Sequence, residues 1–372
     1  MKDSLVETLF NLIKLDGQSR AERPVADFIG QKMKALGYRV EEDLSANSVD
    51  GNTGNLLCFP PHFRADRPAM MLAAHMDTVR PAWQAQPVVQ DNVIRSDNNH
   101  AIGVDNRAGC TVLSHAADYL LRQHAQEANI MFVFTVCEEI GSKGAKELAV
   151  PANVIMGTVF DCSARPGTFI QSTFGAKQFT LEIHGKSAHA GVDPEKGINA
   201  ILLASNIIAG LPVGRVSPDL TCNVAKISGG GPINVVPDYV RVDGEIRGSD
   251  REQISSMLQR MKELGDKVCQ ISGGMFSLST ESHFSPYRID ENSQIFQLVF
   301  RVLSSSGLTP NPIHYPGGSD ANVFNEKGLP SINVGIGAQR PHSGGEFIFV
   351  EDLIASYNIA TKLVDEFSAA NW

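Results

Sequence analysis

Acidic and histidine side chains stand directly after apolar runs in this chain, and that pattern constrains its fold. The residues that follow such runs are His75, Asp77, Glu138, Glu139, Asp161 and His342. A continuous apolar run is typical of a strand buried on both faces of a parallel sheet. Because open α/β sheets place their active sites at strand ends, the pattern predicts a site built from these side chains.

Length and composition define the class of protein. At 372 residues the chain exceeds one ordinary hydrophobic core, so we expect two domains. A hydrophobic content of 42% and a charged content of 20% are typical of a soluble globular protein. The net charge of −9 argues against a nucleic-acid partner.

The cysteines and the N-terminus carry further expectations. Six cysteines are widely spaced and form no CxxC pair, which argues against a thiolate zinc site and against a disulfide framework. The N-terminus lacks a signal-peptide pattern, and no apolar run is long enough to span a membrane. We expect reduced thiols in a cytoplasmic protein without a membrane partner.

Strand and helix patterns alternate in the first half of the chain. Strands are predicted at about 38–42, 69–74, 88–95, 130–137 and 154–160, and helices at the N-terminus, 22–36, 107–123 and 144–148. This alternation predicts an α/β fold with a mostly parallel sheet and helices on both faces.

The pattern changes near Gly175. Alternating strands at 177–183, 221–227, 240–247 and 275–281, with helices at 197–209 and 251–272, predict an α+β module. A helix at 293–305, a strand at 331–337 and a helix at 350–369 follow. His342 can join the site of Asp161 only if the module is an insertion. We therefore predict a discontinuous catalytic domain, 1–174 and 284–372, and an inserted domain, 175–283.

Two histidines and several carboxylates are the ligand types that hold a pair of divalent metal ions. His75 and Asp77 point the same way from a strand end, so Asp77 could orient a metal-bound His75; a surface turn is the alternative. Asp105 precedes a helix and could be its N-cap, but Asn106 could serve there instead. Asp105 would then be available to bridge two cations.

Glu138 and Glu139 are the sharpest local signal. Adjacent carboxylates at the end of an apolar strand are costly to bury unless cations neutralise them. Their side chains diverge, so one could bind metal while the other acts as a general base. An exposed loop pair is the alternative, and the nearby Gly141 and Gly144, which tighten the turn, disfavour it.

Other candidates depend on the rest of the set. His342 lies in a glycine-rich loop, where a lone histidine is usually only solvated, and Cys162 beside Asp161 could in principle bind metal. From spacing alone, His189 in the predicted module is better interpreted as part of a surface turn.

Possible substrate contacts lie in and after the module. Arg247 could pair with a substrate carboxylate, and Asn223 could donate a hydrogen bond to a reacting carbonyl. Gly317 and Gly318 could bring backbone N–H groups to a ligand.

Taken together, five motifs resemble the co-catalytic zinc exopeptidase family, which includes peptidase T, glutamate carboxypeptidase and the aminoacylases. In chain order these motifs are AHMDTV at 74–79, GVDNRAG at 103–109, CEEIG at 137–141, SAHAG at 187–191 and HSG at 342–344. The resemblance covers nearly the whole chain and is strongest to peptidase T-like members.

The resemblance implies a role for each residue. His75 and Asp161 would bind one metal, Glu139 and His342 the other, and Asp105, followed by a cis peptide in relatives, would bridge them. Asp77 would orient His75, Glu138 would be the general base, and His189 would stabilise the oxyanion, reaching into the partner's site across a homodimer. Arg247, Asn223, Gly317 and Gly318 would hold the substrate end. The resemblance also implies two divalent ions per subunit, zinc first, with cobalt or manganese as alternatives, and a lid and dimerisation role for the inserted domain.

Two departures bear on specificity. Peptidase T proper has two acids and a lysine where this chain has Asp105, Asn106 and Arg107, and a glycine where it has Cys162. We expect a zinc exopeptidase that hydrolyses the amide bond of short peptides in the manner of a tripeptide aminopeptidase, with an amidohydrolase or deacylase of N-acyl amino acids or a related metabolite as the alternative. A non-catalytic binding relative is disfavoured because no ligand or base is missing. A related aminopeptidase group with the same ligand types is disfavoured because it places its insertion elsewhere and lacks the SAHAG turn.

Overall fold

The computed structural model describes residues 1–123, 128–370 and 372, and the chain divides into two compact units. Unit 1 comprises Met1–Ser172, Arg288–His314 and Ser319–Trp372, and unit 2 comprises Thr173–Tyr287 and Tyr315–Gly318. Unit 2 thus includes a short segment, 315–318, that lies beyond the module expected from the sequence. Within the described residues, no helix combines the length and apolarity needed to cross a membrane.

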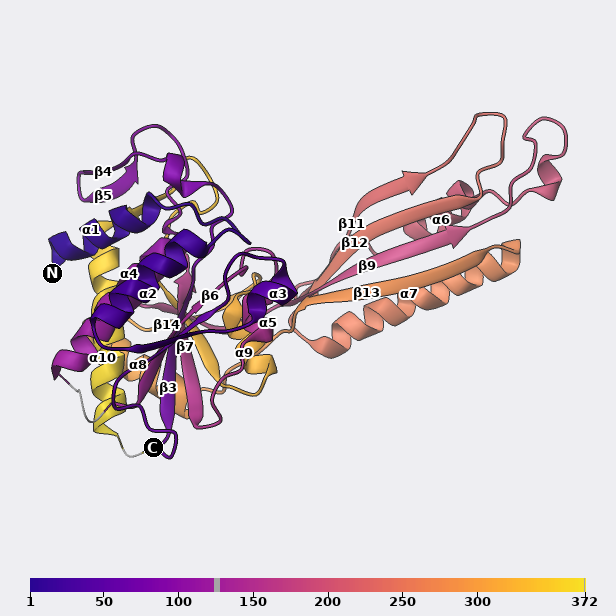
Figure 1. Cartoon of the computed structure of the whole chain (residues 1–372). Helices are drawn as coiled ribbons and strands as arrows, with labels where there is room; N and C mark the ends of the chain where they lie inside the picture. Colours follow the sequence, from indigo (N-terminus) through magenta and orange to yellow (C-terminus); the bar gives the residue numbers. More distant parts are fainter. Residues whose placement is uncertain (124–127, 371) are drawn as a thin grey trace. The chain divides into compact units, whose positions relative to one another are not determined.

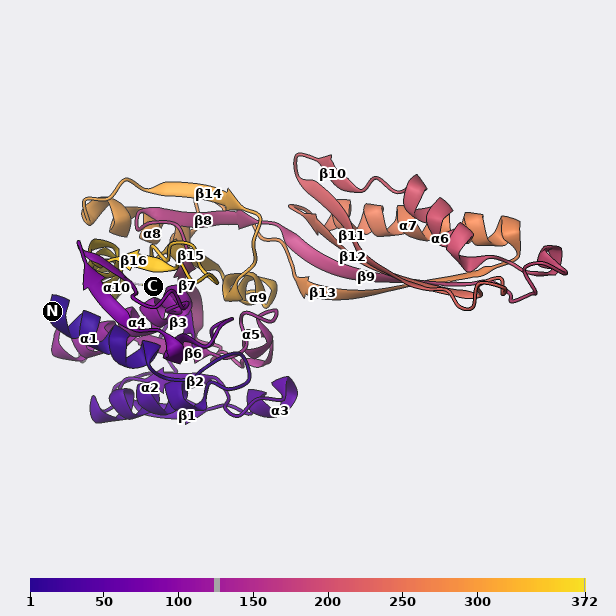
Figure 2. The same ribbon diagram turned by 90° about the horizontal axis from the view of Figure 1, so that it is seen from above.

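Unit 1 is built on an eight-stranded sheet with the order β1-β2-β6-β3-β7-β15-β8-β14, which Figure 2 shows from β1 at one edge to β14 at the other. The strands are β1 Arg39–Glu42, β2 Leu56–Phe59, β3 Ala69–His75, β6 Ile130–Thr135, β7 Val154–Cys162, β8 Thr168–Thr173, β14 Asn311–Tyr315 and β15 Ser331–Gly335. The four central strands, β6, β3, β7 and β15, run parallel, and antiparallel strands flank them. The predicted mostly parallel α/β fold is confirmed.

Helices cover both faces of this sheet. They are α1 Lys2–Ile13, α2 Arg23–Ala35, α3 Ser45–Val49, α4 Val104–Gln123, α5 Lys143–Glu147, α8 Gln294–Ser305, α9 Asp320–Glu326 and α10 Val350–Ala369. Figure 1 shows α4 and α10 on one side of the sheet and α9 on the other. All seven residues of β3 are buried, as its continuous apolar sequence requires.

A small three-stranded sheet in unit 1 contains the segment 88–95, which was predicted as a short hairpin strand. This segment forms both strands of a hairpin, in which β4 (Pro87–Gln90) pairs with β5 (Val93–Ser96), and β16 (Phe347–Phe349) pairs with β5. Asp91 and Asn92 form its two-residue turn with positive φ angles of 53° and 60°. Such turns favour Asp and Asn because these residues tolerate the left-handed region.

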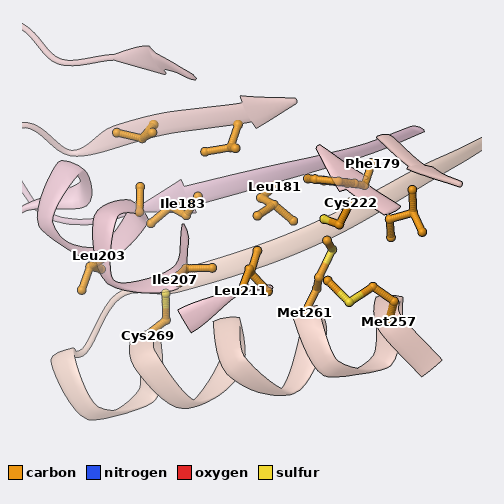
Figure 3. Close-up of a cluster of buried hydrophobic side chains, with 14 of the residues drawn as sticks. Phe179, Leu181, Ile183, Leu203, Ile207, Leu211, Cys222, Met257, Met261 and Cys269 are labelled. Atoms are coloured by element: carbon orange, nitrogen blue, oxygen red, sulfur yellow. The ribbon is translucent and has the colours of Figure 1, made fainter. Parts of the chain in front are cut away.

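Unit 2 is a five-stranded antiparallel sheet, order β10-β11-β12-β9-β13, with two helices. Its elements are β9 Gly175–His184, α6 Ala200–Gly210, β10 Gly214–Ser217, β11 Leu220–Gly229, β12 Tyr239–Gly248, α7 Arg251–Ser272 and β13 Met275–Phe284. Figure 3 shows Phe179 and Leu181 of the sheet on the side of Met257 and Met261 of α7, whereas Ile183 lies nearer Leu203 and Ile207 of α6. Because side chains alternate along a strand, polar residues of the same strands occupy the opposite face of the sheet.

Candidate active site

Three of the predicted ligands converge at the ends of the parallel strands of unit 1. His75 is the last residue of β3, Asp161 lies at the end of β7, and Asp105 lies at the start of α4. His75 Nε2 is 3.1 Å from Asp105 Oδ1 and 3.2 Å from Asp161 Oδ1. The His75 side chain is only 2% exposed, so this cluster is held inside the protein.

A second cluster forms on the other side of Asp105. His342 Nε2 lies 2.9 Å from Glu139 Oε1 and 3.4 Å from Asp105 Oδ2. Asp105 therefore places one carboxylate oxygen beside each histidine. His342 adopts a left-handed backbone conformation with φ of 63° in the loop before β16.

Asp77 joins the two strand ends that carry these residues. Its side chain is fully buried, and Oδ1 lies 3.2 Å from His75 Nδ1. Oδ1 accepts the Glu138 amide at 3.0 Å, and Oδ2 accepts the Glu139 amide at 3.2 Å and the Ser19 hydroxyl at 2.6 Å. Contacts of this kind orient an imidazole so that its other nitrogen faces a metal.

The bridging loop has the backbone geometry that the resemblance implies, with a cis peptide bond between Asp105 and Asn106. Asn106 Oδ1 accepts the Gly109 amide at 3.0 Å, so Asn106 takes the capping role and leaves the Asp105 carboxylate available. Glu346 was missed from the sequence. It accepts the amides of Gly103 at 2.7 Å and Asp105 at 3.1 Å, and its position just after the HSG motif was the one available signal.

Burial and crowding shift the pKa values of the site. Burial raises the pKa of Glu138 well above its usual range; the nearby His75 opposes this, and the Asp161 charge adds to it. Burial likewise raises the pKa of Glu139 to about 7, against the hydrogen bond from His342. Hydrogen bonds to Asp105 and Glu139 raise the pKa of His342 to about 10. Positive charge is thus favourable where these carboxylates meet.

Asp320 is a further buried carboxylate that sequence reasoning missed. It is the first residue of α9, is 1% exposed and accepts the Thr135 hydroxyl. Burial raises its pKa to about 6. The only signal for Asp320 in the sequence is its place directly after Gly317, Gly318 and Ser319. The prediction for the two glycines concerned their backbone N–H groups and did not extend to Asp320.

The donor set fits divalent metal ions. Ligand atoms of His75, Asp105 and Glu139 all lie within 4.8 Å of one another. Imidazole nitrogens and carboxylate oxygens are the usual protein ligands of zinc. Cys162 is buried and burial raises its thiol pKa to about 12, which disfavours the thiolate form that metals bind.

The remaining predicted residues belong to unit 2. His189 is exposed, and its Nδ1 accepts the Gly191 amide at 3.1 Å. Arg247 Nε donates to Glu245 Oε1 at 2.6 Å, and its Nη1 donates to the Pro316 carbonyl, next to Gly317, at 3.3 Å.

Asn223 pairs opposite Glu245 on the neighbouring strand. Arg247, Asn223 and the loop of Gly317 and Gly318 are thus gathered within unit 2, whereas His189 lies on a separate turn bridged to Val235. Glu245 was missed from the sequence, although its place two residues before Arg247 on one strand was visible.

Comparisons with known proteins identify relatives of this chain. Residues 171–270 match the M20 peptidase dimerisation domain, and residues 85–180 match the M42 glutamyl aminopeptidase model. The protein YqjE of Bacillus subtilis (strain 168) is 28% identical over 97% of this chain and 98% of its own. Peptidase T of Escherichia fergusonii is 23% identical over 98% of both chains.

The crystal structure of aminopeptidase PepT from Bacillus cereus ATCC 10987 is 28% identical, with a TM-score of 0.91 and 99% of both chains covered. A tripeptidase from Staphylococcus aureus subsp. aureus Mu50 gives the same identity and TM-score over 100% of this chain and 99% of that chain. Fold, site and relatives together indicate a metal-dependent peptidase that resembles the M20 peptidases. Among these peptidases, the chain is similar to peptidase T proteins over nearly its whole length.

Proposed function

We propose that this peptidase is a two-metal exopeptidase that hydrolyses the amide bond of short peptides. The observation that carries the proposal is the position of the Asp105 carboxylate. Its two oxygens lie beside two different histidines. His75 and Asp161 would hold one ion and Glu139 and His342 the other, with Asp105 shared. When bound, the ions, zinc above all, would polarise the scissile carbonyl and lower the pKa of the attacking water.

Glu138 is the proposed general base. The Ser142 hydroxyl lies 3.5 Å from Glu138 Oε1, and within the described part of the chain no hydrogen bond joins the Glu138 side chain to either histidine. Asp77 accepts a hydrogen bond from the Glu138 amide. This contact holds the backbone from which the Glu138 side chain extends. Glu138 would take a proton from water and pass it to the leaving amine.

Residues of unit 2 would bind the substrate. His189, exposed on its turn, would act in the active site of the partner subunit of a homodimer and stabilise the oxyanion. Arg247 would hold a terminal carboxylate, Asn223 would donate a hydrogen bond, and Gly317 and Gly318 would offer backbone N–H groups. The inserted domain would serve as lid and dimerisation domain.

The central test replaces Glu138 by glutamine. We expect E138Q to retain two metals by elemental analysis and to lose turnover, because the amide can no longer accept the proton. Wild-type turnover in E138Q would rule out Glu138 as the base.

Substrate class needs a separate panel of tripeptides, dipeptides and N-acyl amino acids assayed with the zinc-loaded protein. We expect tripeptides and dipeptides to be cleaved. Cleavage of N-acyl amino acids alone would instead favour the deacylase alternative.

A further inference from the structure

Two charged side chains that the proposed function does not use lie buried beside the site. Glu22 precedes the first turn of α2, and Arg107 lies in the first full turn of α4. Both side chains are 0% exposed. Burying a charge is strongly unfavourable unless partners compensate it, so the contacts of both side chains matter.

Glu22 contacts the turn that carries the proposed base. Its Oε1 accepts the backbone amide of Cys137 at 2.9 Å. Cys137 has a φ of 54°, a left-handed conformation that is unfavourable for a non-glycine residue and persists only when neighbours hold it. The next two amides, of Glu138 and Glu139, are held by Asp77. Two buried carboxylates therefore bind three successive amides of this turn.

Arg107 contacts the backbone directly after β3, the strand that neighbours β6. Its Nη1 donates to the carbonyl of Met76, and its Nη2 donates to the carbonyl of Gly17 at 3.4 Å. Burial lowers the pKa of Arg107, and the charges of Asp77 and Glu22 act in the opposite direction. The guanidinium thus partly compensates the two carboxylates that hold the turn.

A purely stabilising role explains Glu22 poorly. Among the described residues, its second oxygen, Oε2, is buried without a hydrogen-bond partner. Leaving a buried acceptor unsatisfied is destabilising, and a buried apolar side chain would avoid that cost. Natural proteins retain destabilising features of this kind mainly at functional sites.

We propose that Glu22 is a positioning residue for Glu138. The hydrogen bond from the Cys137 amide to Glu22 Oε1 holds the left-handed residue that precedes Glu138 and so sets the direction of the Glu138 side chain. The inference rests on the proposed function, because it takes Glu138 as the base. Glu22 itself touches none of the proposed metal ligands in the described part of the chain.

Two conservative variants separate the hydrogen bond from the charge. E22D keeps the charge but is one methylene too short to reach the Cys137 amide. E22Q loses the charge but keeps an oxygen in place. We expect E22D to lower kcat about 10- to 100-fold, the usual effect of removing a supporting contact, with KM and metal content unchanged. We expect E22Q to stay within about threefold of wild-type kcat.

The matched control is D352N. Asp352 is a buried carboxylate of α10 that pairs with Arg165 at 2.8 Å, outside the site. D352N is expected to lower the unfolding temperature without a comparable loss of kcat. The proposal is overturned if folded E22D keeps wild-type kcat, if E22Q is as slow as E22D, or if D352N is equally slow.

E22Q is isosteric and keeps the test decisive if E22D does not fold, since a slow, folded E22Q would alone refute the proposal. E138Q, measured alongside, separates the two claims. Inactive E138Q with fast E22D overturns only the positioning role, whereas active E138Q overturns the proposed base and the inference with it.

Discussion

The site of unit 1 and the uncovered sheet face of unit 2 are both rich in charge, but the charges are arranged differently. In unit 1, the Asp105, Asp161 and Glu139 side chains are 12%, 11% and 8% exposed and meet at two imidazoles. In unit 2, opposite charges stand in adjacent pairs along β12, Arg241 with Asp243 at 2.7 Å and Arg247 with Glu245 at 2.6 Å.

This difference is consistent with the two proposed roles, metal binding in unit 1 and substrate binding in unit 2. Buried carboxylates in excess are stable only with cations nearby, so unit 1 has the electrostatics of a metal centre. Paired, partly exposed charges are already compensated and are worth little to stability. They can exchange partners with a polar ligand at low cost, which suits the binding of a substrate end.

The largest expected difference in activity is between two Asp-to-Asn substitutions, one in each region. D105N removes the charge that both histidine clusters share, so we expect loss of metal from both positions and a fall in kcat/KM of at least about 1,000-fold. D243N breaks an exposed pair and should leave kcat/KM within about threefold, because such pairs contribute about 0–1 kcal/mol. Elemental analysis and peptide hydrolysis measure both. Two metals retained in D105N would contradict the shared-ligand assignment.

Sequence patterns were sufficient to predict the central strands and the candidate site residues at their ends. The segments β3, β6 and β7 are mainly apolar, and predicted site residues lie at the end of each strand or within three residues after it. The long helices α7 and α10 have clear periodicity and begin and end at the predicted residues.

Short or mixed elements were missed for physical reasons. The segment β14 contains Pro312 and lies at the sheet edge, and α9 has only seven residues, too few for a helical pattern to emerge. The contacts of Glu22 and Glu346 link residues more than a hundred positions apart. Nothing local in the sequence records such contacts, because they exist only once the chain has folded.

Metal binding should stabilise the protein through unit 1. At a free zinc concentration about 100 times the dissociation constant, binding to the folded state adds about 2.7 kcal/mol per site to the free energy of unfolding. We expect scanning calorimetry to show a higher unfolding temperature with zinc than with a chelator, and the shift to vanish in D105N. D243N should keep it. An equal shift in D105N would place the stabilising zinc elsewhere.

The smallest effect tests the paired charges of unit 2. Arg247 is 39% exposed and its partner Glu245 28% exposed, so a substrate carboxylate must compete with Glu245 for the guanidinium. E245Q removes that competitor, and we expect KM for peptides with a free C-terminus to fall by up to about fivefold, the range set by exposed ion pairs, with kcat unchanged. R247Q should raise KM for the same peptides. Peptides with an amidated C-terminus provide the control, because they lack the competing carboxylate and should not respond to E245Q. If amidated and free peptides respond alike, Glu245 orients Arg247 rather than competing for it, and the charge pair belongs to the scaffold of the sheet.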